Sequence, residues 1–179
     1  MAERTDTLTW INRGLFVLFT FAICVMQLLP LGMEPAGWAG PDLLLAATLV
    51  WVARKPGYLP VWLIAAIFLM ADLLFLRPPG LWAGLVMILT EVIRRQHREF
   101  RNMPLFAEWG TIAVGIVLIT LANRFVLVIV MAPKPPFGLS LMEMVATIAA
   151  YPVVVAIAHF GFRVSRAAPG ETGRKGQLL

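Results

Sequence analysis

The chain has 179 residues, of which 60% are hydrophobic and 14% are charged, and its mean hydropathy is +0.82. Soluble domains are about 45–50% apolar and about 25% charged, so a soluble fold of this size would leave too much apolar surface uncovered. The composition therefore argues against a soluble domain, a disordered chain and a disulfide-bonded scaffold. It predicts an all-α integral membrane protein.

The residue types on which most enzymes depend are scarce. The chain has one cysteine, two histidines and two serines (Cys24, His97, His159, Ser140 and Ser165). A zinc site or a structural disulfide needs more cysteine and histidine than this, and no glycine-rich phosphate loop is present. We therefore expect no catalytic residues, no metal and no cofactor, which makes an orphan membrane enzyme the weakest functional hypothesis.

Six apolar segments are predicted to cross the membrane as one helical bundle. They are residues 14–31, 41–52, 58–76, 81–93, 105–130 and 139–162. Residues 1–166 thus form a single polytopic domain, and the polar residues 167–179 are predicted to be a disordered cytoplasmic tail. A spanning helix needs about 20 residues, but the second segment reaches only about 18–22 Å. Either its neighbours shield it, or a re-entrant segment through residues 37–40 precedes it.

The first segment has a rival interpretation as a signal peptide, because a charged leader precedes its apolar stretch. The stretch is longer than the usual apolar core of about 7–15 residues, and Glu3 and Asp6 dilute the positive charge of the leader. An uncleaved membrane helix is therefore favoured.

Positive charge sets the expected orientation. With six spans, one side of the membrane holds twelve basic residues, namely Arg4, Arg13, Arg54, Lys55, Arg94, Arg95, Arg98, Arg101, Arg163, Arg166, Arg174 and Lys175. The other side holds Arg77 and Lys134, and Arg124 lies within a span. The rich side is expected to be cytoplasmic, with both termini on it. The net charge of +5 then reflects topology, and we expect no nucleic-acid partner.

Ionisable residues inside the predicted spans are costly, so each needs a role. Asp42 follows Pro41 at the beginning of the second span, where a carboxylate interacts well with the helix dipole; the alternative is a ligand or partner contact. Asp72 and Arg124 lie at similar depth in the third and fifth spans and are predicted to form an ion pair that locks the bundle. Alternatively, Arg124 pairs with Asp42, or Asp72 belongs to a proton or substrate site or contacts a partner helix.

Other charged residues lie near the ends of the predicted spans. Glu91 precedes Arg94 and Arg95 by three and four residues, a spacing that favours an ion pair on one helix face. Glu108 and Glu143 are expected to be boundary residues of the fifth and sixth spans. All six tryptophans also lie within a few residues of a predicted span end, where an amphipathic ring prefers to sit.

Two further motifs predict contacts. Gly80 and Gly84 form a GxxxG pattern, which permits close approach of two helices either within the chain or between two copies. The basic cluster continues the fourth segment as a cytoplasmic helix and is predicted to bind anionic lipid, at about 1 kcal/mol per basic residue. Its members are Arg94, Arg95, Arg98 and Arg101.

The middle of the chain resembles the rod shape-determining protein MreD family. The resemblance rests on the order of four motifs: Pro41-Asp42 followed by LLLAATLVWVARKPG, Asp72-Leu73-Leu74, the turn Pro78-Pro79-Gly80-Leu81, and Glu91-Val92-Ile93-Arg94-Arg95. The remainder of the chain matches in length, hydropathy and topology only. The double proline at the turn departs from the family pattern.

The resemblance implies a bacterial inner-membrane scaffold of the cell-elongation machinery. Its partners would be MreC, RodA, a class B penicillin-binding protein and the actin-like MreB, and its bundle would be similar to the substrate-binding component of energy-coupling-factor transporters. The second hypothesis is a small-solute-binding transporter component. A cavity lined by Asp42, Asp72 and Arg124 would favour the transporter component, and a closed bundle with a groove open to lipid would favour the scaffold.

Overall fold

The computed structural model describes residues 2–28, 39–96, 103–133 and 135–162, and within 2–9, 11–12 and 159–162 it describes the backbone alone. This part of the chain is all-α and contains six α-helices and one short 3-10 helix. They are α1 (Ala2–Leu28), α2 (Leu43–Arg54), η1 (Pro56–Tyr58), α3 (Val61–Leu74), α4 (Leu81–Arg95), α6 (Leu105–Ile129) and α7 (Phe137–Phe162). Each predicted apolar segment therefore contains a helix. The largest difference is in α1, which begins at Ala2 rather than near residue 14.

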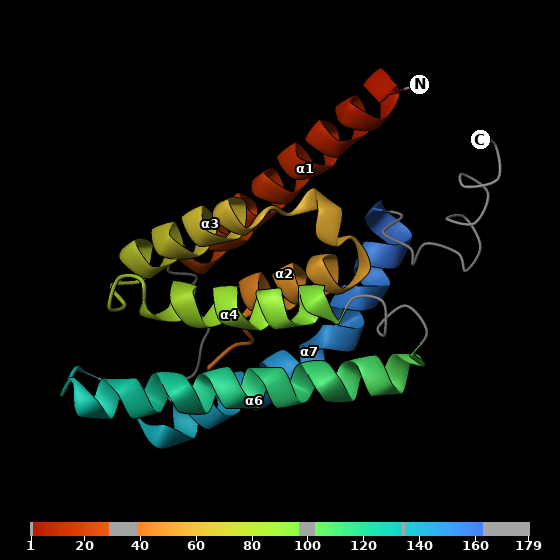
Figure 1. Cartoon of the computed structure of the whole chain (residues 1–179). Coiled ribbons are helices and arrows are strands. Elements are labelled where there is room, and N and C mark those ends of the chain that lie inside the picture. The colour runs from red at the N-terminus through yellow and green to blue at the C-terminus, as the bar shows by residue number, and fades with distance from the viewer. Residues whose placement is uncertain (1, 29–38, 97–102, 134, 163–179) are drawn as a thin grey trace.

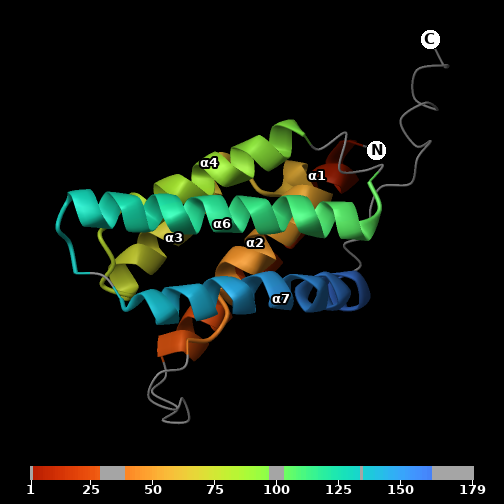
Figure 2. The same ribbon diagram turned by 90° about the horizontal axis from the view of Figure 1, so that it is seen from below.

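The helices lie lengthwise beside one another, so their ends gather at two ends of the bundle (Figures 1 and 2). At one end α3 turns into α4 through residues 75–80, α6 ends and α7 begins; we call it the turn end. At the other end α2 and α4 end near Arg54 and Arg95, and α6 begins; we call it the basic end. Helix α2 occupies the middle and packs against α1, α4 and α7.

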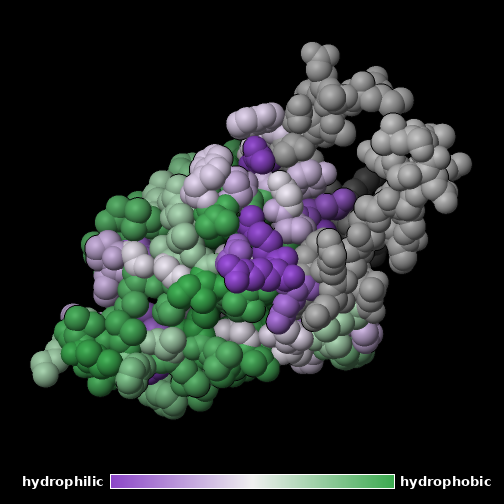
Figure 3. All heavy atoms as spheres, viewed as in Figure 1, coloured by the Kyte–Doolittle hydropathy of each residue, from purple (hydrophilic) through white to green (hydrophobic). Residues whose placement is uncertain are grey.

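Two of the helices are long and apolar enough to cross a membrane, Leu105–Ile129 and Phe137–Ala158. Only 28% of the most apolar stretch of each is buried inside the protein, whereas a core helix of a soluble protein is mostly buried. Their apolar side chains thus face outward. Figure 3 shows this apolar surface over α6 and α3, with the hydrophilic surface gathered near the end of α4. These two helices are therefore candidate membrane spans.

Helix α2 is both short and enclosed by its neighbours. Eleven of its twelve residues are buried, and Trp51 packs against the rings of Phe16 and Phe19 at centroid distances of 5.4 and 5.9 Å. The expectation that neighbours shield this segment is confirmed. Trp51 also corrects the expected interfacial belt of tryptophans, because its ring lies in the core, where Phe16 and Phe19 offer more apolar contact than the bundle surface. The alternative, a re-entrant segment through residues 37–40, stays a prediction, because residues 37 and 38 lie outside the described residues.

The GxxxG pattern does not bring helices together within the described chain. Gly80 takes a left-handed conformation (φ 85°) that begins α4, and a Cβ added at Gly84 would meet no atom within 4 Å. The close approach occurs at Gly115 of α6 instead, where an added Cβ would lie 2.6 Å from Leu89 Cδ1 of α4. Of the two alternatives for this motif, close packing within the chain is therefore not found at Gly84, since α4 presents Leu89 to the neighbouring helix; a contact between two copies stays a prediction.

Candidate functional site

Asp42 fixes the beginning of the central helix. The backbone N–H of Leu45 donates to its Oδ1 at 2.8 Å, and the backbone N–H of Asp42 donates to Oγ1 of Thr147 at 2.9 Å. A side-chain oxygen that accepts from the first turn satisfies a donor which the helix itself leaves unpaired. Asp42 thus plays the helix-stabilising role expected for it, and it also ties α2 to α7.

Asp72 caps the beginning of helix α4 in a similar way. Its Oδ2 accepts from the backbone N–H groups of Gly80 at 3.0 Å and Ala83 at 3.2 Å, across the α3–α4 turn. The residue is fully buried. The predicted Asp72–Arg124 ion pair is wrong. The first turn of α4 lies closer in sequence and offers unpaired N–H donors, so the carboxylate caps that helix instead.

Arg124 finds its partners at the beginning of α7. Its Nη1 donates to Ser140 Oγ at 2.7 Å and to the carbonyl oxygen of Pro135 at 3.4 Å. The guanidinium carbon also lies 5.0 Å from the centroid of the Phe137 ring. The alternative pairing of Arg124 with Asp42 is not formed within the described residues, although both side chains line the same cavity.

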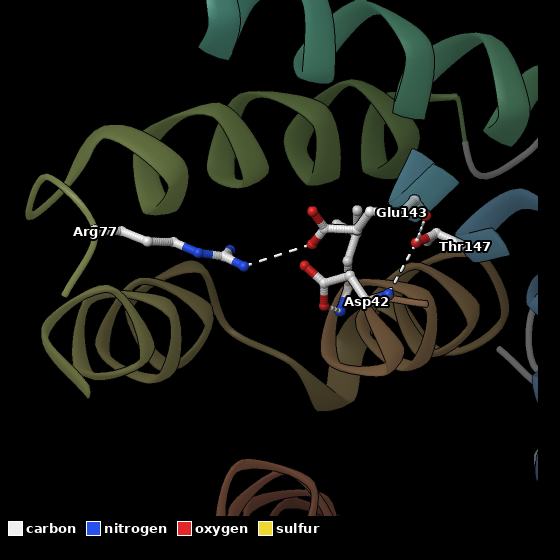
Figure 4. A network of polar contacts seen from close by, with 5 residues as sticks. Asp42, Arg77, Glu143 and Thr147 are labelled. Carbon is white, nitrogen blue, oxygen red and sulfur yellow. Dashed lines mark hydrogen bonds and ion pairs between the residues drawn. The ribbon is translucent and has the colours of Figure 1, made fainter. Parts of the chain in front are cut away.

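An ion pair that the sequence did not predict lies beside the same cavity. Arg77 Nη2 is 3.5 Å from Glu143 Oε1, and both side chains are about one-third exposed. Figure 4 shows Arg77 pointing toward the adjacent carboxylates of Asp42 and Glu143. The turn that carries Arg77, the beginning of α2 and the first half of α7 therefore meet through charged groups.

These groups enclose a cavity of about 140 Å³ at the turn end. The polar residues that line it are Asp42, Arg77, Thr120, Asn123, Arg124, Ser140, Glu143 and Thr147, and Trp82 also belongs to its lining. Asp72 is absent from the lining, so the cavity matches the expected transporter site only in Asp42 and Arg124. Among the residues that the structure describes, no group of three histidine, cysteine, aspartate or glutamate side chains is placed to hold a metal ion.

A second charged cluster lies near the basic end and is closed. Arg54 Nη2 of α2 is 3.6 Å from Glu108 Oε1 of α6, and the hydroxyl of Tyr151 in α7 donates to the same oxygen at 2.8 Å. The two charged side chains are only 7% and 2% exposed. The sequence predicts Glu108 to be a boundary residue, but it is buried in the core. Its charge is accommodated there because Arg54 of α2 lies beside it. The cluster joins three helices in the core.

The surface of the basic end carries the expected ion pairs of α4. Glu91 Oε1 is 3.1 Å from Arg95 Nε and its Oε2 is 3.8 Å from Arg94 Nε, as the spacing predicted. Arg94 also donates to the carbonyl oxygen of Leu59 at 2.6 Å, and Arg13 donates to that of Tyr58 at 3.2 Å. Both arginines thus hold the loop that contains η1. Arg98 and Arg101 of the predicted basic cluster lie outside the described residues.

Sequence reasoning placed Asp42 correctly because a proline-aspartate pair at the start of an apolar run is a local signal. It missed Glu108, Tyr151 and Glu143, whose partners lie on helices far away in the chain. The signal available for Glu108 was its position inside an apolar segment that carries few other charges. Comparison of the chain with protein-family models, with curated proteins and with solved structures finds no match.

Proposed function

We propose that this protein is a non-catalytic scaffold of the bacterial inner membrane, which holds partner proteins of the cell-elongation machinery through its outward-facing helices. The observation that carries the proposal is the bonding of Asp72, the most buried carboxylate among the described residues. Asp72 is fully buried, its Oδ2 accepts from the first turn of α4, and it does not line the cavity, which supports a role in stabilising the bundle rather than in binding a substrate. A carboxylate of a proton relay or a transport path instead faces an aqueous cavity.

In this proposal all six helices lie in the membrane and both termini are cytoplasmic. The support for this orientation is the charge distribution: the described basic end carries Arg13, Arg54, Lys55, Arg94 and Arg95. Such a bias is typical of the cytoplasmic side. The short helices α2, α3 and α4 are then accommodated because they pack beside longer ones.

Partner binding would occur through lateral helix packing. Helix α1 contacts the rest of the bundle along a single stripe, in which Phe16, Thr20 and Cys24 are buried. Its opposite face exposes Leu18, Phe21 and Met26. Helices associate in lipid by van der Waals packing of such surfaces. The resemblance to the MreD family proposes the occupants: MreC first, then RodA, a class B penicillin-binding protein and MreB.

The test is co-purification of the chain with MreC in detergent. We expect MreC to be recovered with the parent protein, and we expect recovery to fall when Leu18 and Phe21 on the outer face of α1 are both changed to alanine. The matched control changes Leu118 and Phe125 on the outer face of α6, which are equally exposed. Absence of MreC from the parent preparation would contradict the scaffold hypothesis.

The charged cavity favours one other function, a small-solute-binding component of a transporter. It places Asp42 and Arg124, two of the three residues that this hypothesis names, around a common space. Its volume of about 140 Å³ is well below the roughly 300–1,000 Å³ of drug-sized ligand sites, which favours a substrate smaller than a vitamin. Uptake of a labelled solute by vesicles that contain the protein, and not by empty vesicles, would support this second function over the first.

A further inference from the structure

The cavity at the turn end brings together charged groups of both signs. Asp42 comes from the beginning of α2, Glu143 from α7, Arg77 from the α3–α4 turn and Arg124 from α6. Two carboxylates and two guanidinium groups make the set neutral overall. A bare anion in the cavity would meet the carboxylates, and a bare cation would meet the guanidinium groups.

The charged groups retain unused hydrogen-bonding capacity. Asp42 accepts through Oδ1 and Glu143 is paired through Oε1, while Arg124 donates only through Nη1. Within the described residues no further bond engages the second oxygen of either carboxylate or the remaining nitrogens of Arg124. These groups therefore offer acceptors beside α2 and α7 and donors beside α6.

A buried donor at the cavity wall also lacks a partner. Trp82 lines the cavity and is 9% exposed, and its indole Nε1 has no acceptor in the described part of the protein. Buried polar atoms in native proteins are nearly always hydrogen-bonded. An acceptor group held in the cavity would satisfy this N–H. The orphan donor is an observation independent of the charges.

We propose that the cavity binds a small zwitterion, a molecule with a primary ammonium group and an anionic oxygen group a few bonds apart. The ammonium would bind the carboxylates of Asp42 and Glu143, and the anionic group would bind Arg124 and the indole N–H of Trp82. Binding of this ligand is a proposal separate from the scaffold role, and the experiments below test it independently of that role.

The volume limits the size of the ligand. A protein cavity of about 150 Å³ holds one benzene molecule, or about six non-hydrogen atoms, and this cavity measures about 140 Å³. Glycine and alanine have this size and both charges. The ethanolamine headgroup of a phospholipid carries the same chemistry, because its ammonium lies two carbons from the phosphate ester. The shared chemistry is an ammonium paired with an anion, and the two sources differ in whether the ligand is free or attached to lipid.

The first experiment uses the unaltered full chain in detergent without lipid. Binding of labelled alanine is measured in competition with propionate, which lacks the ammonium, and isopropylamine, which lacks the carboxylate. We expect alanine to bind at least about tenfold more tightly than either, since each lost charged hydrogen bond weakens binding by about that factor or more. Equal binding of alanine and propionate, or binding of inorganic phosphate alone, would overturn the proposal.

The second arm asks whether the zwitterion is a lipid headgroup. The protein is extracted from bilayers of phosphatidylethanolamine mixed equally with phosphatidylglycerol, and the retained lipid is identified by native mass spectrometry. Selective retention of phosphatidylethanolamine, with no alanine binding, supports the lipid source; alanine binding supports the free source. Equal retention of the two lipids with no alanine binding rejects both.

Variants then assign the site. Glu143→Gln and Arg124→Gln are each expected to weaken binding of whichever zwitterion is found by at least about tenfold. The matched controls are Glu91→Gln and Arg95→Gln, which remove an equivalent pair at the basic end and should leave affinity unchanged. Thermal unfolding of each variant separates loss of the site from loss of the fold. Folded cavity variants that bind like the parent would overturn the assignment.

Discussion

The two ends of the bundle hold ion pairs of nearly the same length in very different surroundings. Arg54 and Glu108 are 3.6 Å apart and almost fully buried, whereas Arg77 and Glu143 are 3.5 Å apart and about one-third exposed. A buried pair is costly to break, because its remaining charge stays desolvated. An exposed pair contributes little, because water screens it. Burial rather than distance therefore separates a cluster that holds the core together from one that borders an open cavity.

The comparison predicts its largest effect at Glu108. Glu108→Ala removes the partner of a buried guanidinium and the acceptor of the Tyr151 hydroxyl, so the free energy of unfolding should fall by about 3–5 kcal/mol. Reversible unfolding of the detergent-solubilised protein by a denaturing detergent measures it. Replacing Arg54 by Met and Glu108 by Leu together should recover much of the loss. A single-variant effect below about 1 kcal/mol would remove the distinction between the two ends.

Asp72 offers the next largest effect, at the turn end but away from the cavity. Asp72→Ala leaves the N–H groups of Gly80 and Ala83 without their acceptor, and we expect the free energy of unfolding to fall by about 1–2 kcal/mol. Asp72→Asn keeps one carbonyl oxygen that is able to accept both bonds, so its effect should be smaller. The same unfolding measurement decides this, and an Asn variant as unstable as the Ala variant would show that the negative charge matters more than the cap.

Between the two ends, Gly115 tests the packing of α6 on α4. Gly115→Ala places a Cβ 2.6 Å from Leu89 Cδ1, so Leu89 must shift and stability should fall by about 1 kcal/mol. Gly110→Ala is the matched control in the same helix, since a Cβ there meets no atom within 4 Å; it should be neutral or stabilising by about 0.5–1 kcal/mol. In a Leu89→Ala background the cost of Gly115→Ala should disappear. Equal effects at the two glycines would place the close contact elsewhere.

The smallest effect is expected at the exposed pair. Arg77→Gln should change the free energy of unfolding by less than about 1 kcal/mol, and raising the salt concentration should reduce the difference further. Thermal unfolding at low and high salt provides the measurement. A loss as large as that of Glu108→Ala would mean that the turn end is as strongly coupled as the basic end.

The sequence predicted the helices well, because long apolar runs bounded by proline, glycine and arginine are local signals. It also predicted the local contacts of Asp42 and of Glu91. It did not predict contacts between residues of different helices. The predicted pair of Asp72 and Arg124 is absent, because Asp72 bonds to the first turn of α4 and Arg124 bonds to Ser140 of α7. Depth along a helix is readable from spacing, but the rotation of each helix about its axis is not, and that rotation decides which side chains meet. Glu108, Gly115 and Glu143 escaped prediction for the same reason.

Helix α2 has one more consequence, which concerns the order in which the chain is made. Its beginning is tied to α7 by the bond from Asp42 to Thr147, 105 residues later. Contacts between such distant residues form slowly and late, and they leave the waiting surfaces open to wrong partners. The central helix is synthesised well before α7, so it acquires its main neighbour only when α7 emerges. Docking of α7 thus completes the enclosure of α2, and loss of α7 would uncover the most buried helix of the described chain.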